Sequence, residues 1–382
     1  MAALSGGHFA TDFAGGALPA LLPFLRDRFS LSYTLVAVLV LASQLSSSLI
    51  QPLFGLWSDR RGAIWLLPAG TAVAGIGIAL AADAPSYGLV VLCVFVSGVG
   101  VAAYHPEAAK FAAYVSGRRR ASGMSLFSIG GNMGYAVGPI VTALLVHRLG
   151  LAGGLLLAVP CLVGAVLLAA VSRYLAGFVP ERREAARRSG FDQPHAVALL
   201  LAVIAFRNVA WFGLITFVPL WEVSLGHSKQ EGARLLALML LAGGVGTLAL
   251  GPLADRLGRR PVLFASVVAT PPLVLAYVLV GGVPGALALM LLGACVVGTF
   301  GITMVMAQEY LPRHIGLASG LTVGFAIGLG GAAAVVLGAV ADAVDLRTAL
   351  YVCAASPVVA AVLAAFLPAA RARRALAPEL AA

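Results

Sequence analysis

The chain has 382 residues, of which 61% are hydrophobic and only 10% are charged, and its mean hydropathy is +1.00. Soluble domains carry roughly 25% charged residues, so this composition excludes an ordinary soluble enzyme or binding module and is typical of an integral membrane protein. The formal net charge of +10 would suit a nucleic-acid partner, but the positions of the basic residues point instead to membrane orientation.

Apolar runs, broken by polar or Gly/Pro-rich residues, predict an all-α membrane protein with twelve transmembrane helices, each near the ~20 residues that cross a bilayer. The predicted spans are 8–25, 33–57, 64–82, 86–112, 121–147, 151–174, 196–221, 232–254, 261–281, 284–310, 316–341 and 346–367. The widest interruption, 175–195, is charged and central. We therefore expect an N-terminal six-helix bundle (1–174), a cytoplasmic linker (175–195), a C-terminal six-helix bundle (196–368) and a cytoplasmic tail (369–382).

Lys and Arg residues are unevenly shared between the two sets of predicted loops, with 16 on one side, 6 on the other and 3 at or within helices. The positive-inside rule makes the richer side cytoplasmic. Both termini then lie in the cytoplasm, as an even number of spans requires. We expect a multi-pass protein of the bacterial inner membrane, a monomer whose partners are the lipid bilayer, protons and a small-molecule substrate, with no nucleic acid.

The two halves carry a repeated loop pattern after their second helices. The stretch from Gly55 to Gly62 has the form Gly-x-x-x-Asp-Arg-x-Gly, and the stretch from Gly251 to Gly258 repeats it. Two copies at matched positions indicate a duplicated unit in parallel orientation, which is a transporter architecture. The residues that we expect to act in gating on this side are Asp59, Arg60, Asp255, Arg256, Arg259 and Arg260.

This repeated pattern resembles the loop motif of the major facilitator superfamily, although Ala63-Ile64 replaces basic residues in the first copy. The fifth predicted helix resembles the motif of that superfamily's drug–proton antiporters. Its small residues form one stripe that allows close helix packing, and its proline bends the helix. The residues assigned to this packing role are Gly130, Gly134, Gly138 and Pro139.

Several further stretches resemble the fosmidomycin-resistance family of efflux proteins. They include His8-x-x-x-Asp12, His105-Pro106-Glu107 and the run from Leu311 to Gly320. The resemblance covers nearly the whole chain. It implies the major facilitator fold and proton-coupled export of a small anionic antibiotic such as fosmidomycin.

Ionisable residues within membrane spans are costly, so those that are retained usually face a cavity and mark function. We predict proton coupling by Glu107 first, and then by Asp12, His8 or Glu309. Each has a structural alternative: Glu107 could form a salt bridge with Lys110, the His8 and Asp12 pair could bond loop ends, and Glu309 could be a gate residue or solvated.

Arg207 lies deep within the seventh predicted span, and its planar guanidinium suits a phosphonate or carboxylate. Trp211, one turn on, could stack on it. The rival role for Arg207 is to balance the charge of Glu107 or Glu309. The residues predicted to bind substrate are Arg207, His105, Lys110, Asn208, Trp211 and Gln308.

The sequence therefore favours a proton-coupled antiporter that exports a small polar or anionic compound. The alternative is a proton-coupled importer of an organic acid or sugar with the same fold. We expect no enzyme activity, because the chain lacks a nucleophile elbow and a phosphate loop. The four cysteines fall in apolar runs without ligand spacing, so we expect no metal and no cofactor.

Overall fold

The computed structural model describes residues 1–61, 63–116, 120–178, 191–312, 318, 321–322 and 326–368. The first half contains α1 (Ala2–Phe29), α2 (Tyr33–Arg61), α3 (Leu66–Asp83), α4 (Tyr87–Ser116), α5 (Arg120–Leu149) and the 3-10 helix η2 (Leu151–Leu157), which leads into α6 (Ala158–Leu175). The second half contains α7 (Pro194–Ser224), α8 (Lys229–Leu257), α9 (Arg259–Val280), α10 (Gly282–Gly298), α11 (Phe300–Tyr310), α13 (Ala326–Ala343) and α14 (Leu346–Ala365).

The described part of the chain is all-helical, and its helices correspond to the twelve predicted spans. Ten of them are long and apolar enough to cross a membrane. The helix α1 is not among the ten, because polar residues such as Thr11 and Asp12 interrupt its apolar sequence. The helix α13 is not among the ten either, and the residues before it, 323–325, lie outside the described residues. Residues 179–190 of the predicted linker and the tail 369–382 lie outside the described residues.

The span predicted as one helix over 284–310 is divided in the structure. The helix α10 ends at Gly298 and α11 begins at Phe300, with Thr299 between them. The Thr299 hydroxyl donates to the carbonyls of Cys295 or Val296, at 3.1 and 3.0 Å, and such back-bonding often bends a helix. The break lies inside an apolar run, so hydropathy gave no sign of it.

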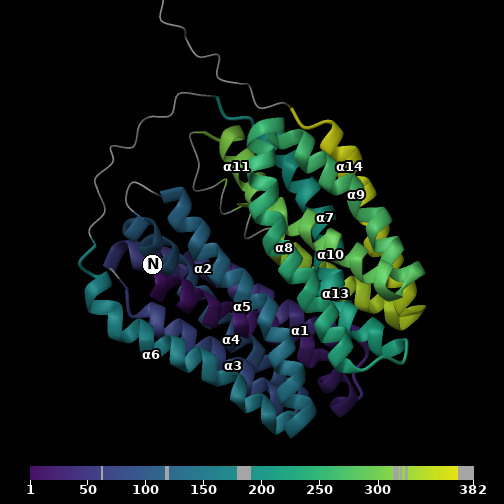
Figure 1. Cartoon of the computed structure of the whole chain (residues 1–382), viewed down its shortest axis with the longest axis horizontal. Helices are drawn as coiled ribbons and strands as arrows, with labels where there is room; N and C mark the ends of the chain where they lie inside the picture. Colours follow the sequence, from purple (N-terminus) through teal and green to yellow (C-terminus); the bar gives the residue numbers. More distant parts are fainter. Residues whose placement is uncertain are drawn as a thin grey trace, which may run out of the picture.

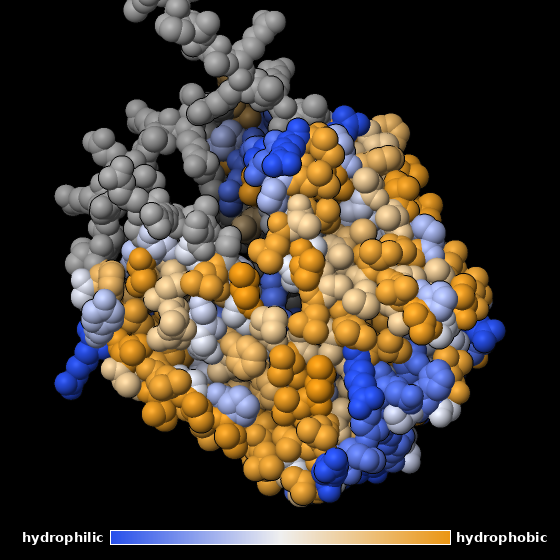
Figure 2. Space-filling model, in the orientation of Figure 1, coloured by the Kyte–Doolittle hydropathy of each residue, from blue (hydrophilic) through white to orange (hydrophobic). Residues whose placement is uncertain are grey.

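Helices α1 to α6 lie together on one side of the molecule and α7 to α14 on the other (Figure 1). Across the boundary α2 contacts α13 and α5 contacts α8. Apolar residues cover most of the face shown in Figure 2, with hydrophilic residues gathered towards two opposite margins. This is the surface expected of a protein surrounded by lipid, because the bilayer core is as apolar as the side chains that face it.

The glycine stripe of α5 lies against the backbone of α1. A Cβ added at Gly130 or Gly134 would overlap the carbonyl of Ser5 or Phe9, and one at Gly138 would stand 2.7 Å from the carbonyl of Phe13. Any larger residue would push the two helices apart. The stripe therefore sets the distance between α5 and α1, which carries two of the predicted site residues.

We call the end of the molecule where α1 begins and α2 ends the inner end, and the opposite end the outer end. Polar contacts join the two halves at the outer end. The Asp342 carboxylate on α13 accepts hydrogen bonds from the backbone N–H groups of Tyr33 and Thr34 at 2.7 and 2.9 Å, and from the Thr34 hydroxyl at 2.6 Å. These N–H groups belong to the first turn of α2 and have no partner within the helix. Lys229 also pairs with Asp27 across the boundary.

Candidate functional site

A cavity lies between the first-half helices and α7. Its walls come from α1, α2, α4, α5 and α7, and include Asp12, Gln44, Val101, Tyr135 and Ile215. Its volume of about 70 Å³ has room for water, but a pocket that encloses a drug-sized ligand measures roughly 300–1,000 Å³. A substrate of that size would need this cavity to widen.

Three predicted site residues meet beside this cavity. The Asp12 carboxylate lies between two imidazoles, with Oδ2 3.2 Å from His8 Nε2 and Oδ1 3.2 Å from His105 Nε2. The His8 ring stacks on Phe127, with ring centroids 4.1 Å apart. The i, i+4 spacing of His8 and Asp12 predicted their pairing, whereas the contact with His105 on α4 required the tertiary structure.

A second cluster joins α4 to α2. The Lys110 Nζ lies 2.6 Å from Glu107 Oε2, and both side chains also hydrogen-bond to Ser58. Glu107 is 1% exposed, and its other oxygen, Oε1, has no hydrogen-bond partner among the described residues. The salt bridge predicted as the structural alternative for Glu107 is thus present. Ser58 directly precedes Asp59 of the first loop motif, a link that the sequence did not reveal.

Arg207 is fully buried on α7. Its Nη1 donates to the Thr299 hydroxyl at 2.9 Å, and its guanidinium lies over the Phe300 ring, 4.6 Å from the centroid. The structure thus places Phe300, rather than Trp211, against the guanidinium, and Trp211 packs edge-on to Phe300. Within the described residues, Nε and Nη2 of Arg207 have no hydrogen-bond partner. Asn208 is buried beside it.

Glu309 belongs to a third cluster at the inner end. Its Oε1 lies 2.6 Å from Arg259 Nη1, and Arg259 also approaches Asp255, at 3.7 Å. The second loop motif thus contacts the end of α11 through an ion pair. Arg260 donates to the carbonyl of Ala365 at 2.6 Å. The gate role that the sequence left open for Glu309 stays a prediction.

The remaining predicted residues are placed less tightly. Arg256 is exposed on the last turn of α8, and Gln308 is half-buried near the end of α11. The side chains of Asp59 and Arg60 lie outside the described residues. Sequence reasoning missed Tyr135 and Gln44, which line the cavity, and the only signal for either was a polar group within an apolar helix.

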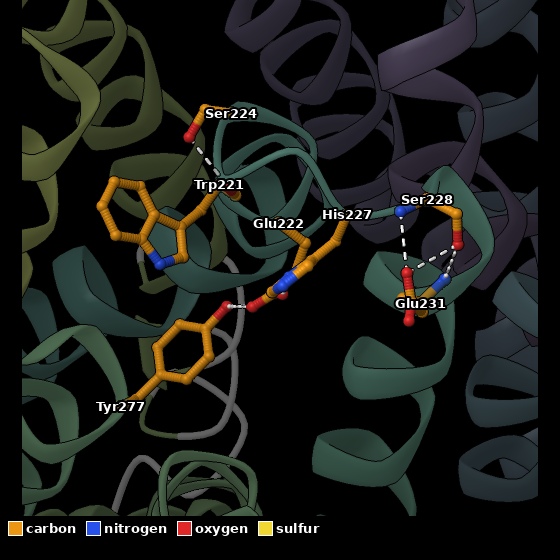
Figure 3. A network of polar contacts seen from close by, with 7 residues as sticks. All are labelled: Trp221, Glu222, Ser224, His227, Ser228, Glu231 and Tyr277. Atoms are coloured by element: carbon orange, nitrogen blue, oxygen red, sulfur yellow. Dashed lines mark hydrogen bonds and ion pairs between the residues drawn. The ribbon is translucent and has the colours of Figure 1, made fainter. Parts of the chain in front are cut away.

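The outer end of the second half holds a further polar network (Figure 3). The buried Glu222 carboxylate accepts a hydrogen bond from the Tyr277 hydroxyl at 2.7 Å and pairs with His227 Nδ1 at 2.6 Å. Next to it, Ser228 and Glu231 form a capping box at the start of α8, which satisfies free N–H groups of that helix end. None of these residues was singled out from the sequence.

The fold and the clusters on α1, α4 and α7 can now be set beside known proteins. The family model described as "Major Facilitator Superfamily" matches residues 4–335 and 235–381. The chain belongs to the major facilitator superfamily. This is a class of transporters rather than enzymes, so the chain is a multi-pass membrane transporter of that class.

Two curated proteins are similar to this transporter over nearly their whole length. An uncharacterized MFS-type transporter, YfnC of Bacillus subtilis (strain 168), is 31% identical over 371 residues, which cover 94% of this chain and 90% of that protein. The fosmidomycin resistance protein of Escherichia coli (strain K12) is 31% identical over 385 residues, which cover 96% of this chain and 92% of that protein.

Solved structures share the fold at low sequence identity. A point mutant of the nucleoside transporter NupG superposes with a TM-score of 0.77 at 14% identity, covering 96% of this chain and 98% of that one. A bacterial homolog of the human lysosomal transporter Spinster, in an inward-facing and occupied conformation, gives 0.76 at 15% identity and covers 95% of each chain. These likenesses identify the major facilitator fold.

Proposed function

We propose that this transporter exports a small polar or anionic compound of the fosmidomycin type in exchange for protons. The observation that carries the proposal is Arg207, a fully buried cation whose Nε and Nη2 lack hydrogen-bond partners among the described residues. A buried charge is costly unless a counter-charge and hydrogen bonds compensate it. An anionic substrate would supply both. The similarity to a protein named for fosmidomycin resistance supports the same substrate class.

The geometry around Arg207 supports the orientation of such an anion. Thr299 holds one nitrogen of the guanidinium and Phe300 lies against its face, which leaves the Nε–Nη2 edge for two oxygens of one phosphonate or carboxylate. An arginine can contact such a group through two parallel hydrogen bonds. Asn208 and Trp211 complete the proposed binding region on α7, with His105, Lys110 and Gln308 as further candidates.

Proton coupling is assigned to a carboxylate on α1 or α4. Glu107 is the first candidate, because it is buried and one of its oxygens lacks a partner among the described residues. A proton on it would weaken the pair with Lys110 and the hydrogen bond from Ser58, which lies within the first loop motif. Asp12 is the second candidate, since it borders the cavity. Glu309, which pairs with Arg259, is better suited to gating.

Transport then proceeds by two six-helix bundles rocking about the central site. Contacts such as Asp27–Lys229 and Asp342–Thr34 hold the outer end together while the inner end admits substrate. The loop motifs at Asp59 and Asp255 hold the inner end together in the opposite state. In this proposal both termini lie in the cytoplasm and the protein works as a monomer in the bacterial inner membrane.

The test is expression in a bacterium that lacks its own drug pumps, followed by fosmidomycin susceptibility and by transport in membrane vesicles. We expect resistance, and pH-gradient-driven uptake into inverted vesicles. Arg207→Ala should abolish both, while the surface variant His147→Gln should behave like the wild type. Substrate uptake confined to right-side-out vesicles would instead establish the importer. An absence of pH-gradient-driven movement in either orientation would overturn proton coupling.

A further inference from the structure

Three potential ligand groups converge where α1, α4 and α5 meet. The nitrogens of His8 and His105 and the carboxylate of Asp12 all lie within 4.8 Å of one another. Each Nε2 is 3.2 Å from a carboxylate oxygen. Ligand atoms about 2.0–2.1 Å from a tetrahedral Zn²⁺ stand about 3.4 Å apart. The side chains are therefore already spaced like part of a coordination shell.

The outer nitrogens of both imidazoles are bound to backbone carbonyls. His8 Nδ1 lies 2.8 Å from the carbonyl of Phe127, and His105 Nδ1 lies 2.9 Å from that of Val101. A carbonyl can only accept, so each Nδ1 carries a hydrogen, and a neutral ring then has its lone pair on Nε2. When the rings are neutral, both lone pairs face the Asp12 carboxylate. Metal-binding histidines show this same arrangement, with the remote N–H donated to a carbonyl or carboxylate.

A glycine of α5 packs directly against this cluster. A Cβ added at Gly131 of α5 would lie 2.6 Å from Asp12 Oδ2 and closer still to His8 Nε2. Glycine at this position thus lets α5 lie against His8 and Asp12 without displacing their ligand atoms. Asp12 also borders the water-sized cavity, so an ion held here would have a route to solvent and a free coordination position on that side.

We propose that His8, Asp12 and His105 bind one divalent transition-metal ion, such as Zn²⁺ or Co²⁺. Two imidazoles and one carboxylate form the ligand set, and imidazole favours these metals over Mg²⁺ or Ca²⁺. The fourth position faces the cavity and takes a water or an oxygen of an anionic substrate. This goes beyond proton-coupled export, since it places a metal cation beside the cavity that Asp12 lines. The competing occupants are protons, one on each Nε2.

The experiment titrates Co²⁺ into the purified full-length transporter in detergent, after removal of any affinity tag and washing with a chelator. We expect one Co²⁺ per chain, with the visible absorption of a tetrahedral site, displaced by Zn²⁺. His105→Gln and Asp12→Asn should each weaken binding at least ~100-fold, because loss of even an outer-sphere partner costs 10–100-fold. His147→Gln, which removes an exposed histidine on α5, should bind like the wild type.

Gly131→Ala places a methyl group against His8 Nε2 and Asp12 Oδ2, and Gly6→Ala is its matched control, since a Cβ at Gly6 meets nothing within 4 Å. Only the first should weaken Co²⁺ binding. The elution profile and the thermal melting curve identify variants that fail to fold. If one of the ligand variants fails to fold, His8→Gln is used in its place. Absence of stoichiometric Co²⁺ binding by the wild type overturns the proposal, as does unchanged binding by folded His8→Gln and His105→Gln. Transport without Co²⁺ binding would overturn the metal-site proposal but not the export proposal. Co²⁺ binding without pH-driven transport would overturn the export proposal but not the metal-site proposal.

Discussion

Among the described residues, two clusters pair a carboxylate with histidine, and they differ in which ring nitrogen faces the acid. At the outer end, Glu222 faces His227 Nδ1 and also receives the Tyr277 hydroxyl, so each of its oxygens has a donor (Figure 3). At the cavity, Asp12 faces the Nε2 atoms of His8 and His105. The Nδ1–H groups of these two rings donate to backbone carbonyls.

The carboxylates of Glu222 and Asp12 thus differ in how their oxygens are satisfied. The acid at the outer end needs nothing further and serves to hold α7, α9 and the loop before α8 together. The acid at the cavity faces two Nε2 atoms that can hold either protons or, as we propose, one metal ion. Glu107 and Arg207 differ from both acids, since each has a buried polar atom without a partner among the described residues. In the proposed function, a proton on Glu107 and an anionic substrate at Arg207 would complete these two groups.

The largest difference is expected between two glutamates. Glu107→Gln should lower the rate of pH-gradient-driven transport about a hundredfold or more, because an amide cannot carry the coupled proton. Substrate exchange should be spared. Glu222→Gln should leave transport within about twofold of the wild type, since its network lies apart from the path. Flux in proteoliposomes with and without a pH gradient measures both. Normal gradient-driven transport by Glu107→Gln would show that Glu107 does not carry the coupled proton, and Asp12 would become the first candidate.

The next effect concerns Arg207 and substrate affinity. Arg207→Lys keeps the charge but loses the planar guanidinium that can donate two parallel hydrogen bonds. Binding of an anionic substrate should therefore weaken about ten- to hundredfold, as expected for a charge-assisted contact of roughly 1.5–3 kcal/mol. Arg207→Ala should weaken it further. Binding titrations on folded protein give the constants. Wild-type affinity in Arg207→Lys would exclude two-point recognition, and wild-type affinity in Arg207→Ala would make this arginine a structural counter-ion.

A smaller and purely structural effect is expected at Tyr277. Tyr277→Phe removes the donor to the buried Glu222 Oε1 and should lower the free energy of unfolding by about 1–3 kcal/mol, the cost of an unsatisfied buried acceptor. Transport should be unchanged. Thermal unfolding in detergent, alongside Tyr351→Phe as a matched control at an exposed tyrosine, measures the loss. An equal melting temperature in the two variants would show that the network does not stabilise the fold.

The smallest effect depends on pH. The hydrogen bond to Glu222, together with its negative charge, raises the pKa of His227, whose side chain is 52% exposed in the loop before α8. Because the folded-state pKa is the higher one, the stabilisation is full below the unfolded value of about 6.5 and is lost as the pH rises through the folded value. His227→Gln should therefore lower the melting temperature at about pH 5.5 and much less at about pH 9. A pH-independent difference would exclude this linkage.

The sequence by itself determined the membrane class, the twelve helices and the polar residues worth attention. Hydropathy is a property of a local window, and a bilayer sets the length of each span, so both can be read without knowledge of the fold. The pairing of His8 with Asp12 and of Glu107 with Lys110 followed from helix spacing in the same way. The break at Thr299 did not, because threonine in an apolar run carries no signal of its own.

Only the tertiary structure decided which helices supply each partner. The position of His105 against Asp12, of Thr299 and Phe300 against Arg207, and of Arg259 against Glu309 depends on how each helix is rotated and how deep it sits. Periodicity does not encode those relations, since many rotations bury an apolar helix equally well. The close approach of α1 and α5, allowed by a stripe of glycines, selects one of them and brings the Asp12 carboxylate between its two histidines.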